Sequence, residues 1–256
     1  MKITLIQTHL IWEDAKANRN NFTRLIESVN QQTDLIVLPE MFTTGFTMNP
    51  ETVYETMEGE SVSWMKETAM RTGCALTGSL VIKENGNYYN RLLFVYPDGS
   101  YKTYNKRHLF TLAGEDKHYT AGKEKLIVDY KGWKICLQVC YDLRFPVFAR
   151  NTEDYDLLLF PANWPKQRTT AWDSLLRARA IENMCYTIGV NRIGTDNSGH
   201  EYSGHTQLIG PLGEYLLEPA IKEGVYTIEI SKEELLEARD KFGFLKDRDN
   251  FTLLPG

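Results

Sequence analysis

Strand-like apolar runs alternate with helix-like segments along the chain, and this alternation most limits the folds available to it. Residues 2–8 (KITLIQT) and 34–40 (DLIVLPE) have the pattern of strands, with an amphipathic helical segment near residues 15–30 between them. Further helices are expected near residues 61–72 and 168–185. Strands joined through helices build sheets whose faces the helices cover. We therefore predict an α/β fold with large sheets and helices packed outside them.

Turn signals indicate that parts of these sheets are antiparallel. The segments ENGN, residues 84–87, and PDGS, residues 97–100, each separate two β-rich runs, and a third hairpin is expected to turn at Lys131-Gly132. Glycine supplies the positive φ that tight hairpin turns require. Near the C-terminus, Ser231 is expected to cap a last helix, with Glu234 at the capping-box position.

Composition excludes several classes of protein. The net charge of −5 favours neither nucleic acid nor an anionic membrane surface, and no apolar run reaches the ~18–20 residues of a membrane span. The N-terminus has the pattern of a first strand rather than of a secretory signal. The cysteines, Cys74, Cys136, Cys140 and Cys185, are therefore expected to be reduced thiols in the cytoplasm. Because no linker or low-complexity segment interrupts the chain, residues 1–256 are predicted to form a single domain.

Several of the apolar runs end in reactive or polar residues. These are Glu40, Lys106, Cys140, Asn163 and Asn191, each at the carboxyl end of a predicted strand. Sites in α/β sheets form at the carboxyl ends of strands. A carboxylate can take a thiol proton, and an ammonium can stabilise both the thiolate and a developing oxyanion. These strand ends therefore carry the parts of a cysteine-nucleophile site.

The segment KICLQVCYDLRFP, residues 134–146, brings Cys140 to the end of an apolar run and surrounds it with polar groups. Cys136 lies within the run and is interpreted as apolar filler. The reactive thiol is expected to be accessible and to have a lowered pKa. Taken singly, each of these residues fits a non-catalytic role better: Cys140 as apolar filler, Glu40 as a solvated strand end and Lys106 as a surface charge.

Other catalytic and metal-binding patterns are not supported. The chain has no G-x-S-x-G motif for a serine hydrolase and no papain-type flank around a cysteine. Cys136 and Cys140 form a C-x₃-C pattern, but four residues along a strand separate them by about 13 Å, too far for one zinc ion. No metal site is predicted.

In combination, these segments resemble the nitrilase, or carbon–nitrogen hydrolase, superfamily. The matching segments are LIVLPEMF at 35–42, YNKRHLF at 104–110, VCYDLRFPVFAR at 139–150, FPANWP at 160–165, RARAIENMCYTIGVNRIG at 177–194 and GHTQLIGPLGE at 204–214. The resemblance runs from residue 3 to about residue 230. It implies a four-layer α-β-β-α sandwich, pairing of subunits into at least a homodimer, and no metal or organic cofactor.

The resemblance also implies roles for individual residues. Glu40, Lys106 and Cys140 match the family's catalytic triad, and Glu115 best fits a second glutamate used by many members, with Glu124 as its competitor. Residues expected to bind the substrate are Tyr141, Arg144, Phe46 and Trp164.

The sequence CYDLRFP after the nucleophile resembles the ω-amidase branch, whose bacterial members deaminate 2-oxoglutaramate. The expected reaction is cleavage of the amide C–N bond of a small ω-amide through a cysteine thioester. A nitrilase or an N-carbamoyl hydrolase on the same scaffold is the alternative. A catalytically silent interaction protein is a third hypothesis, but such a protein has no chemical need for Glu40, Lys106 and Cys140 together.

The carboxylate of an ω-amide substrate requires a cation in the pocket. Arg144 is the first candidate, because its planar guanidinium suits a carboxylate, and Arg192 is the second. The alternative for Arg144 is a structural salt bridge to Asp142 or a helix end. His108 is a possible lining residue with an ordinary hydrogen-bonded role expected, and the resemblance places Glu182 where it would help orient the catalytic groups.

Overall fold

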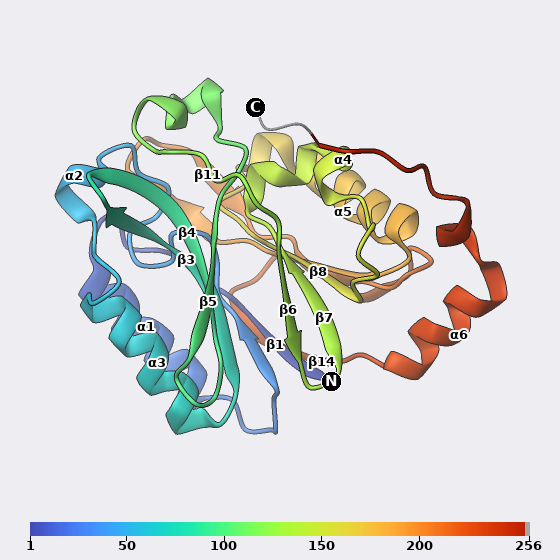
Figure 1. Cartoon of the computed structure of the whole chain (residues 1–256). Coiled ribbons are helices and arrows are strands. Elements are labelled where there is room, and N and C mark those ends of the chain that lie inside the picture. Colours follow the sequence, from blue (N-terminus) through green and yellow to red (C-terminus); the bar gives the residue numbers. More distant parts are fainter. Residues whose placement is uncertain (254–256) are drawn as a thin grey trace.

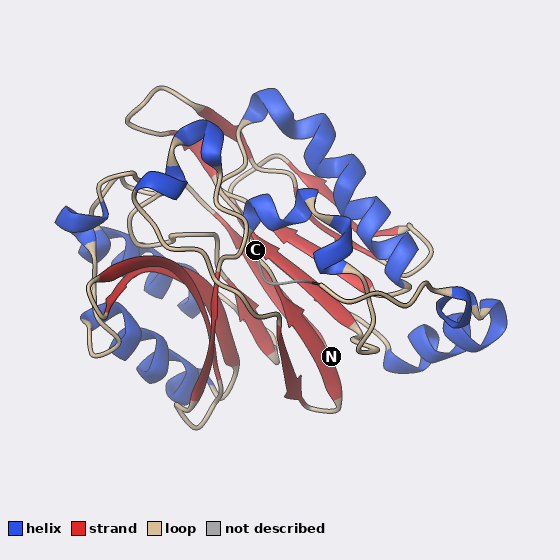
Figure 2. Ribbon diagram, turned by 45° about the horizontal axis from the view of Figure 1, so that its top comes forward, coloured by secondary structure: helices blue, strands red, loops and turns tan. Residues whose placement is uncertain are grey.

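The structure, a computed structural model that describes residues 1–253, is a sandwich of two six-stranded sheets between outer helices (Figures 1 and 2). The first sheet has the order β14-β1-β2-β3-β4-β5. Its strands are β1 (Lys2–Gln7), β2 (Leu35–Val37), β3 (Ala75–Glu84), β4 (Asn87–Val95), β5 (Tyr101–Asn105) and β14 (Gly224–Glu229).

The second sheet has the order β13-β12-β9-β8-β7-β6. Its strands are β6 (Leu126–Tyr130), β7 (Trp133–Leu137), β8 (Leu157–Pro161), β9 (Tyr186–Val190), β12 (Thr206–Ile209) and β13 (Tyr215–Ala220). A separate hairpin consists of β10 (Ile193–Thr195) and β11 (Glu201–Ser203).

Helices form the two outer layers. The α-helices are α1 (Ala15–Glu27), α2 (Pro50–Val53), α3 (Glu60–Thr72), α4 (Pro146–Ala149), α5 (Thr169–Asn183) and α6 (Lys232–Phe242). Short 3₁₀ helices are η1 (Thr111–Ala113), η2 (Glu115–Lys117), η3 (Cys140–Arg144), η4 (Lys166–Arg168) and η5 (Phe244–Asp247). Helices α1 and α3 lie against the first sheet and α5 against the second, so the predicted four-layer α-β-β-α sandwich is confirmed (Figure 1).

Local sequence explains where several elements start and stop. At the β3–β4 and β6–β7 turns, Asn85-Gly86 and Lys131-Gly132 all adopt positive φ, as the hairpin signals predict. Ser231 accepts a hydrogen bond from Glu234 N at 3.2 Å and caps α6. Glu234 is the third residue of the helix, the capping-box position, as predicted, but the reciprocal bond from its side chain is absent from the hydrogen bonds of residues 1–253.

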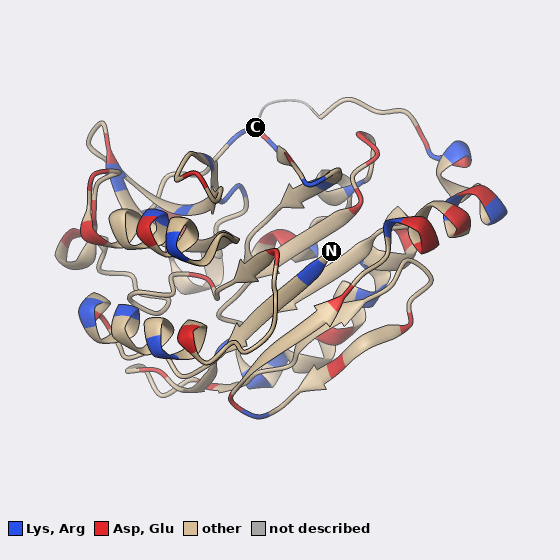
Figure 3. Cartoon of the chain, turned by 90° about the horizontal axis from the view of Figure 1, so that it is seen from below, with Lys and Arg blue, Asp and Glu red and all other residues tan. Residues whose placement is uncertain are grey.

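A hydrophobic core fills the space between the two sheets. One continuous buried cluster includes Leu5 and Phe94 of the first sheet with Leu137 and Leu159 of the second, and it extends to Trp172 of α5. Charged residues gather on the outer helices and loops, with both signs interspersed (Figure 3). No helix of the described part of the chain is long and apolar enough to cross a membrane.

Strand directions bring the predicted site residues to one edge. Strand β2 is parallel to β1 and β3, and β5 runs in the same direction because β4 is antiparallel to both of its neighbours. Strands β7, β8 and β9 are parallel to one another in the second sheet. Glu40 and Lys106 follow β2 and β5 of the first sheet, and Cys140 and Asn163 follow β7 and β8 of the second. These segments of the two sheets are in contact, since Asn163 N donates to Glu40 Oε2.

Candidate active site

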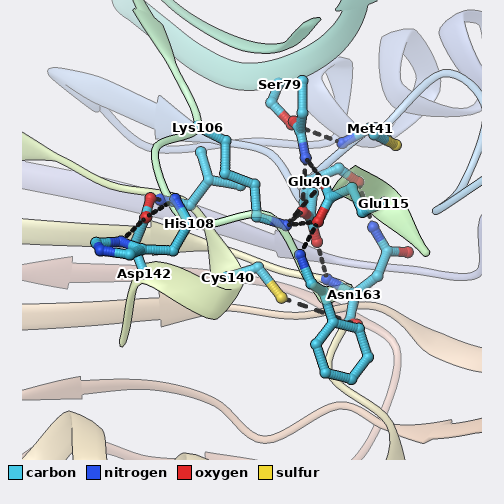
Figure 4. Close-up of polar contacts among 12 residues, drawn as sticks. Glu40, Met41, Ser79, Lys106, His108, Glu115, Cys140, Asp142 and Asn163 are labelled. Carbon is cyan, nitrogen blue, oxygen red and sulfur yellow. Dashed lines mark hydrogen bonds and ion pairs between the residues drawn. The ribbon is translucent and has the colours of Figure 1, made fainter. Parts of the chain in front are cut away.

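Glu40 lies on a tight turn that follows β2 and is fully buried. The next residue, Met41, has φ of 43°, a conformation that non-glycine residues seldom adopt. Ser79 of β3 holds this turn, because its hydroxyl accepts from Met41 N at 2.8 Å and its carbonyl accepts from Phe42 N at 3.1 Å (Figure 4). The turn therefore fixes the direction in which the Glu40 carboxylate points.

Lys106 directly follows β5, and its ammonium lies between two carboxylates (Figure 4). Its Nζ is 2.9 Å from Glu40 Oε1, 2.9 Å from Glu115 Oε2 and 3.0 Å from Glu115 Oε1. Burial lowers the pKa of Lys106, but Glu115 and Glu40 outweigh that effect and raise the pKa above its ordinary value. Lys106 is therefore a buried, permanently charged donor at neutral pH.

Glu115 opens η2 and is fully buried, whereas Glu124 is exposed. Glu115 Oε2 also accepts a hydrogen bond from Phe110 N at 2.6 Å. Burial raises the pKa of Glu115, Lys106 lowers it and Glu40 raises it, with a net increase. Of the two glutamates weighed from the sequence, the structure brings Glu115 and not Glu124 to Lys106.

Cys140 is the first residue of η3 and has φ of 45°. The expectation that its strand continues to Cys140 is wrong, because β7 ends at Leu137. The 13 Å spacing inferred for Cys136 and Cys140 along a strand therefore does not apply. The thiol points toward Asn163, whose carbonyl lies 4.0 Å from Sγ (Figure 4).

The expected lowered pKa of Cys140 is also wrong. Burial raises the pKa of this thiol well above its ordinary value, the Glu40 carboxylate raises it further, and the Lys106 ammonium only partly opposes them. A thiol in this environment is protonated at neutral pH, and its reactivity requires a base.

The buried carboxylate of Asp142 holds the nucleophile turn in place. Its Oδ2 accepts from Val139 N at 2.9 Å and from the Tyr104 hydroxyl at 2.7 Å. Its Oδ1 accepts from His108 N at 2.9 Å and lies 2.8 Å from His108 Nδ1. His108 thus has a hydrogen-bonded structural role, and the alternative salt bridge between Arg144 and Asp142 is absent from the ion pairs of residues 1–253.

A cavity of about 310 Å³ opens onto Cys140 and Lys106. It is lined by all the residues expected to bind the substrate, namely Phe46, Tyr141, Arg144 and Trp164. The Arg144 guanidinium lies 4.9 Å from the centre of the Trp164 ring, and Lys106 Nζ lies 5.1 Å from the Phe46 ring. The cavity combines a thiol, an ammonium and a half-buried guanidinium, which suits a small polar substrate.

The second arginine candidate, Arg192, is not among the lining residues. It is fully buried, donates to Leu10 O at 3.1 Å and stacks on Tyr202. Arg192 therefore makes internal structural contacts and does not face the cavity. Arg179 donates to Glu182 Oε1 at 2.9 Å and to Leu143 O at 2.6 Å, so Glu182 is connected to the nucleophile turn only through Arg179.

Sequence reasoning missed several lining residues. Arg168 lies against the Phe110 ring in the cavity wall, and the β10–β11 segment contributes Asp196, Ser198, His200 and Tyr202. The position of Arg168 three residues after FPANWP was the only local signal for it. The β10–β11 segment has no pattern beyond a turn. Within residues 1–253, no group of three or more His, Cys, Asp or Glu side chains is arranged to hold a metal ion.

Comparisons with known proteins agree with this geometry. The family model for carbon–nitrogen hydrolases matches residues 2–240. Omega-amidase YafV of Yersinia enterocolitica is 46% identical over 261 residues, which cover 99% of each chain. The 2-oxoglutaramate amidase of Bacillus subtilis (strain 168) is 33% identical over 96% of each chain. A CN-hydrolase superfamily protein from Xanthomonas campestris, solved with an arsenic adduct in its active site, is 44% identical with a TM-score of 0.97, covering 99% of this chain and 98% of that chain.

Proposed function

Because the chain belongs to the carbon–nitrogen hydrolase family, we propose that it hydrolyses the terminal amide of small ω-amides such as 2-oxoglutaramate, releasing ammonia and a dicarboxylate. The observation that carries the proposal is the buried Glu40–Lys106–Glu115 cluster beside the thiol of Cys140. The ω-amidase and 2-oxoglutaramate amidase relatives support this choice of substrate class.

Acylation begins with Cys140 as the nucleophile and Glu40 as the base. Glu40 accepts the thiol proton, and the thiolate attacks the amide carbonyl carbon. The resulting oxyanion receives hydrogen bonds from Lys106 Nζ and from the backbone N–H of Tyr141. One such donor contributes about 3–4 kcal/mol in the transition state. Glu40 then returns its proton to the leaving nitrogen, and ammonia departs to leave a thioester on Cys140.

Deacylation uses the same groups in reverse. Glu40 takes a proton from water, the hydroxide attacks the thioester carbonyl, and the carboxylic acid product leaves as the Cys140 sulfur regains the proton. Glu115 would hold Lys106 in place through both steps, since both of its carboxylate oxygens contact Nζ. No step in this scheme requires a metal or an organic cofactor.

The test is an ammonia-release assay over a panel of 2-oxoglutaramate, succinamate, neutral amides of similar size, nitriles and N-carbamoyl amino acids. Highest kcat/KM is expected for the two ω-amides that carry a carboxylate. Preference for a nitrile or a carbamoyl amino acid would contradict the proposal and favour another reaction on the same scaffold.

The proposed carboxylate ligand is Arg144. Arg144→Lys is expected to lower kcat/KM for 2-oxoglutaramate, with a loss of transition-state stabilisation of about 2–4 kcal/mol, because an ammonium cannot reproduce the paired donors of a guanidinium. The loss should be much smaller for a neutral amide. Equal losses for both substrates would show that Arg144 supports the loop rather than binding the carboxylate. Arg168→Lys is the matched comparison, since Arg168 lines the same cavity.

We further propose that the chain is a single domain that forms a homodimer or a higher homo-oligomer in the cytoplasm and binds neither nucleic acid nor membranes. Exposed apolar side chains on α5 and the β12–β13 turn, Ile181 and Leu212, supply a surface for pairing. The four cysteines are free, which is compatible with a reducing compartment. Sedimentation velocity of the wild type should give the mass of a dimer or of a larger oligomer, and a monomer would contradict this part of the proposal.

A further inference from the structure

Asn90, on β4, contacts Glu40, Lys106 and Glu115 of the candidate site. Its side-chain Nδ2 donates to Glu40 Oε1 at 2.8 Å and to Glu115 Oε1 at 3.3 Å. Its backbone carbonyl accepts from Lys106 N at 2.9 Å. The side chain is almost completely buried, so water does not compete for these bonds.

The hydrogen bonds to Glu40 differ between its two carboxylate oxygens. Each oxygen of an ionised carboxylate offers about two lone-pair sites. Oε1 receives both Lys106 Nζ, at 2.9 Å, and Asn90 Nδ2, and is therefore filled. Among the described residues, Oε2 receives a single hydrogen bond, from Asn163 N at 2.9 Å. Oε2 is thus the oxygen with room for a proton.

The ammonium of Lys106 cannot hold Glu40 alone throughout the reaction. It has three N–H donors, and all three of its short contacts are to Glu40 and Glu115. When Lys106 turns one donor toward a substrate oxyanion, its bonds to the carboxylates weaken. The Asn90 amide is a neutral donor to Oε1 that does not ionise near neutral pH, so it keeps its hydrogen atoms when Glu40 accepts the thiol proton.

The other ionisable groups around Glu40, apart from Lys106, donate no hydrogen bond to either of its carboxylate oxygens among those of residues 1–253. Glu115 repels the Glu40 carboxylate, and the Cys140 thiol is the group that Glu40 must deprotonate. Tyr119 is also nearby, with a pKa that burial and then Glu115 raise, and its hydroxyl donates to Thr47 O. Asn90 is the uncharged donor shared by both carboxylates, and its shorter bond is to Glu40.

We propose that Asn90 is a positioning residue that fills Oε1 of Glu40 and so directs the thiol proton of Cys140 to Oε2. In this step the S–H bond breaks, an O–H bond forms at Oε2, and the sulfur electron pair becomes available for attack. The donor to Oε1 also favours Glu40 over Glu115 as the ionised base. This inference rests on the proposed mechanism, in which Glu40 deprotonates Cys140.

The test is Asn90→Ala, read by the pH dependence of Cys140 alkylation with iodoacetamide and of kcat/KM for 2-oxoglutaramate. A carboxylate that loses a donor holds its proton to higher pH. The acid limb of both profiles should therefore move up by about one pH unit. At pH values on the acid limb, the rate of the variant should be about tenfold lower than that of the wild type, and above the limb the two rates should converge.

Asn90→Asp has the shape of the native side chain and answers the same question if the alanine variant fails to fold. Because it adds a carboxylate beside Glu40, its acid limb should move further upward. Asn87→Ala, an exposed change on the same strand, is the matched control and should leave both profiles unchanged. Glu40→Gln should abolish the acid limb.

A rate loss that is equal at every pH in the Asn90 variants would overturn the inference and leave Asn90 a purely structural residue. Alkylation of Cys140 needs no amide substrate, so it tests the role of Asn90 even if the proposed substrate is wrong. If the alkylation limb moves but no ω-amide is hydrolysed, the substrate proposal fails while the role of Asn90 stands. If ω-amides are hydrolysed but neither limb moves, the role of Asn90 alone fails.

Discussion

At the scale of single residues, the protonated thiol of Cys140 makes catalysis depend on its neighbours. Cys140→Ala should abolish turnover while the protein still folds, because the alanine keeps the Cβ and therefore the same backbone conformation. Circular dichroism and thermal unfolding check the fold, and ammonia release checks activity. Cys74→Ala, which changes a buried thiol outside the cavity, should retain activity.

In the wild-type enzyme, iodoacetamide should label Cys140 ahead of Cys74, Cys136 and Cys185, since it alone of the four lines the cavity. Because burial and the Glu40 carboxylate raise the pKa of this thiol, labelling should be faster at alkaline pH than at neutral pH. Mass spectrometry that finds another cysteine labelled first would overturn the assignment.

The charge of Glu115 matters to the site because both of its carboxylate oxygens contact Lys106 Nζ. Glu115→Gln should reduce activity at least about tenfold, because a neutral amide cannot balance the Lys106 ammonium in the transition state. Stability should change by less than about 2 kcal/mol, since Glu40 still pairs with Lys106. Urea unfolding and steady-state kinetics measure the two effects. A larger activity loss in Glu124→Gln would move the role to Glu124.

At the scale of elements, η3 depends on contacts that are distant in sequence. The hairpin turns at Asn85-Gly86 and Lys131-Gly132 could be predicted from the sequence, because the conformation of a tight turn depends on the residues within it. It did not predict that β7 ends at Leu137. That end is set by Asp142, whose partners Tyr104 and His108 lie more than 30 residues earlier. Periodicity along a single strand contains no information about such a partner.

Asp142→Asn tests the anchoring of this element. The amide replaces one acceptor oxygen with a donor that faces Val139 N–H or Tyr104 O–H, so buried bonds are lost. The free energy of unfolding should fall by about 2–4 kcal/mol, and turnover should fall with it as the nucleophile turn loosens. Asp129→Asn, an exposed change on β6, should alter neither quantity. Unchanged urea unfolding of Asp142→Asn would show that η3 is held by other contacts.

At the scale of the whole molecule, the site forms where two distant halves of the chain meet. Strand-end residues could be chosen from the sequence because parallel strands bring their carboxyl ends to one edge. The family motifs then indicated which of them act together. What the residue pattern could not reveal is that the two sheets face each other, so that Asn163 N reaches Glu40 Oε2 across 123 positions of sequence. Arg168 and the β10–β11 segment were missed for the same reason.

The core between the sheets should make them unfold together. Leu159 is fully buried in the cluster that includes residues of both sheets. Leu159→Ala should lower the free energy of unfolding by about 2–5 kcal/mol, through lost apolar burial and the cavity left behind. Ile221→Ala, at a 68% exposed position, should change it by less than about 0.5 kcal/mol. In urea, loss of far-UV circular dichroism and loss of activity should follow one shared transition in both variants. Two separated transitions would contradict the single-domain proposal, because a sheet with its own independent core could lose its structure without the other.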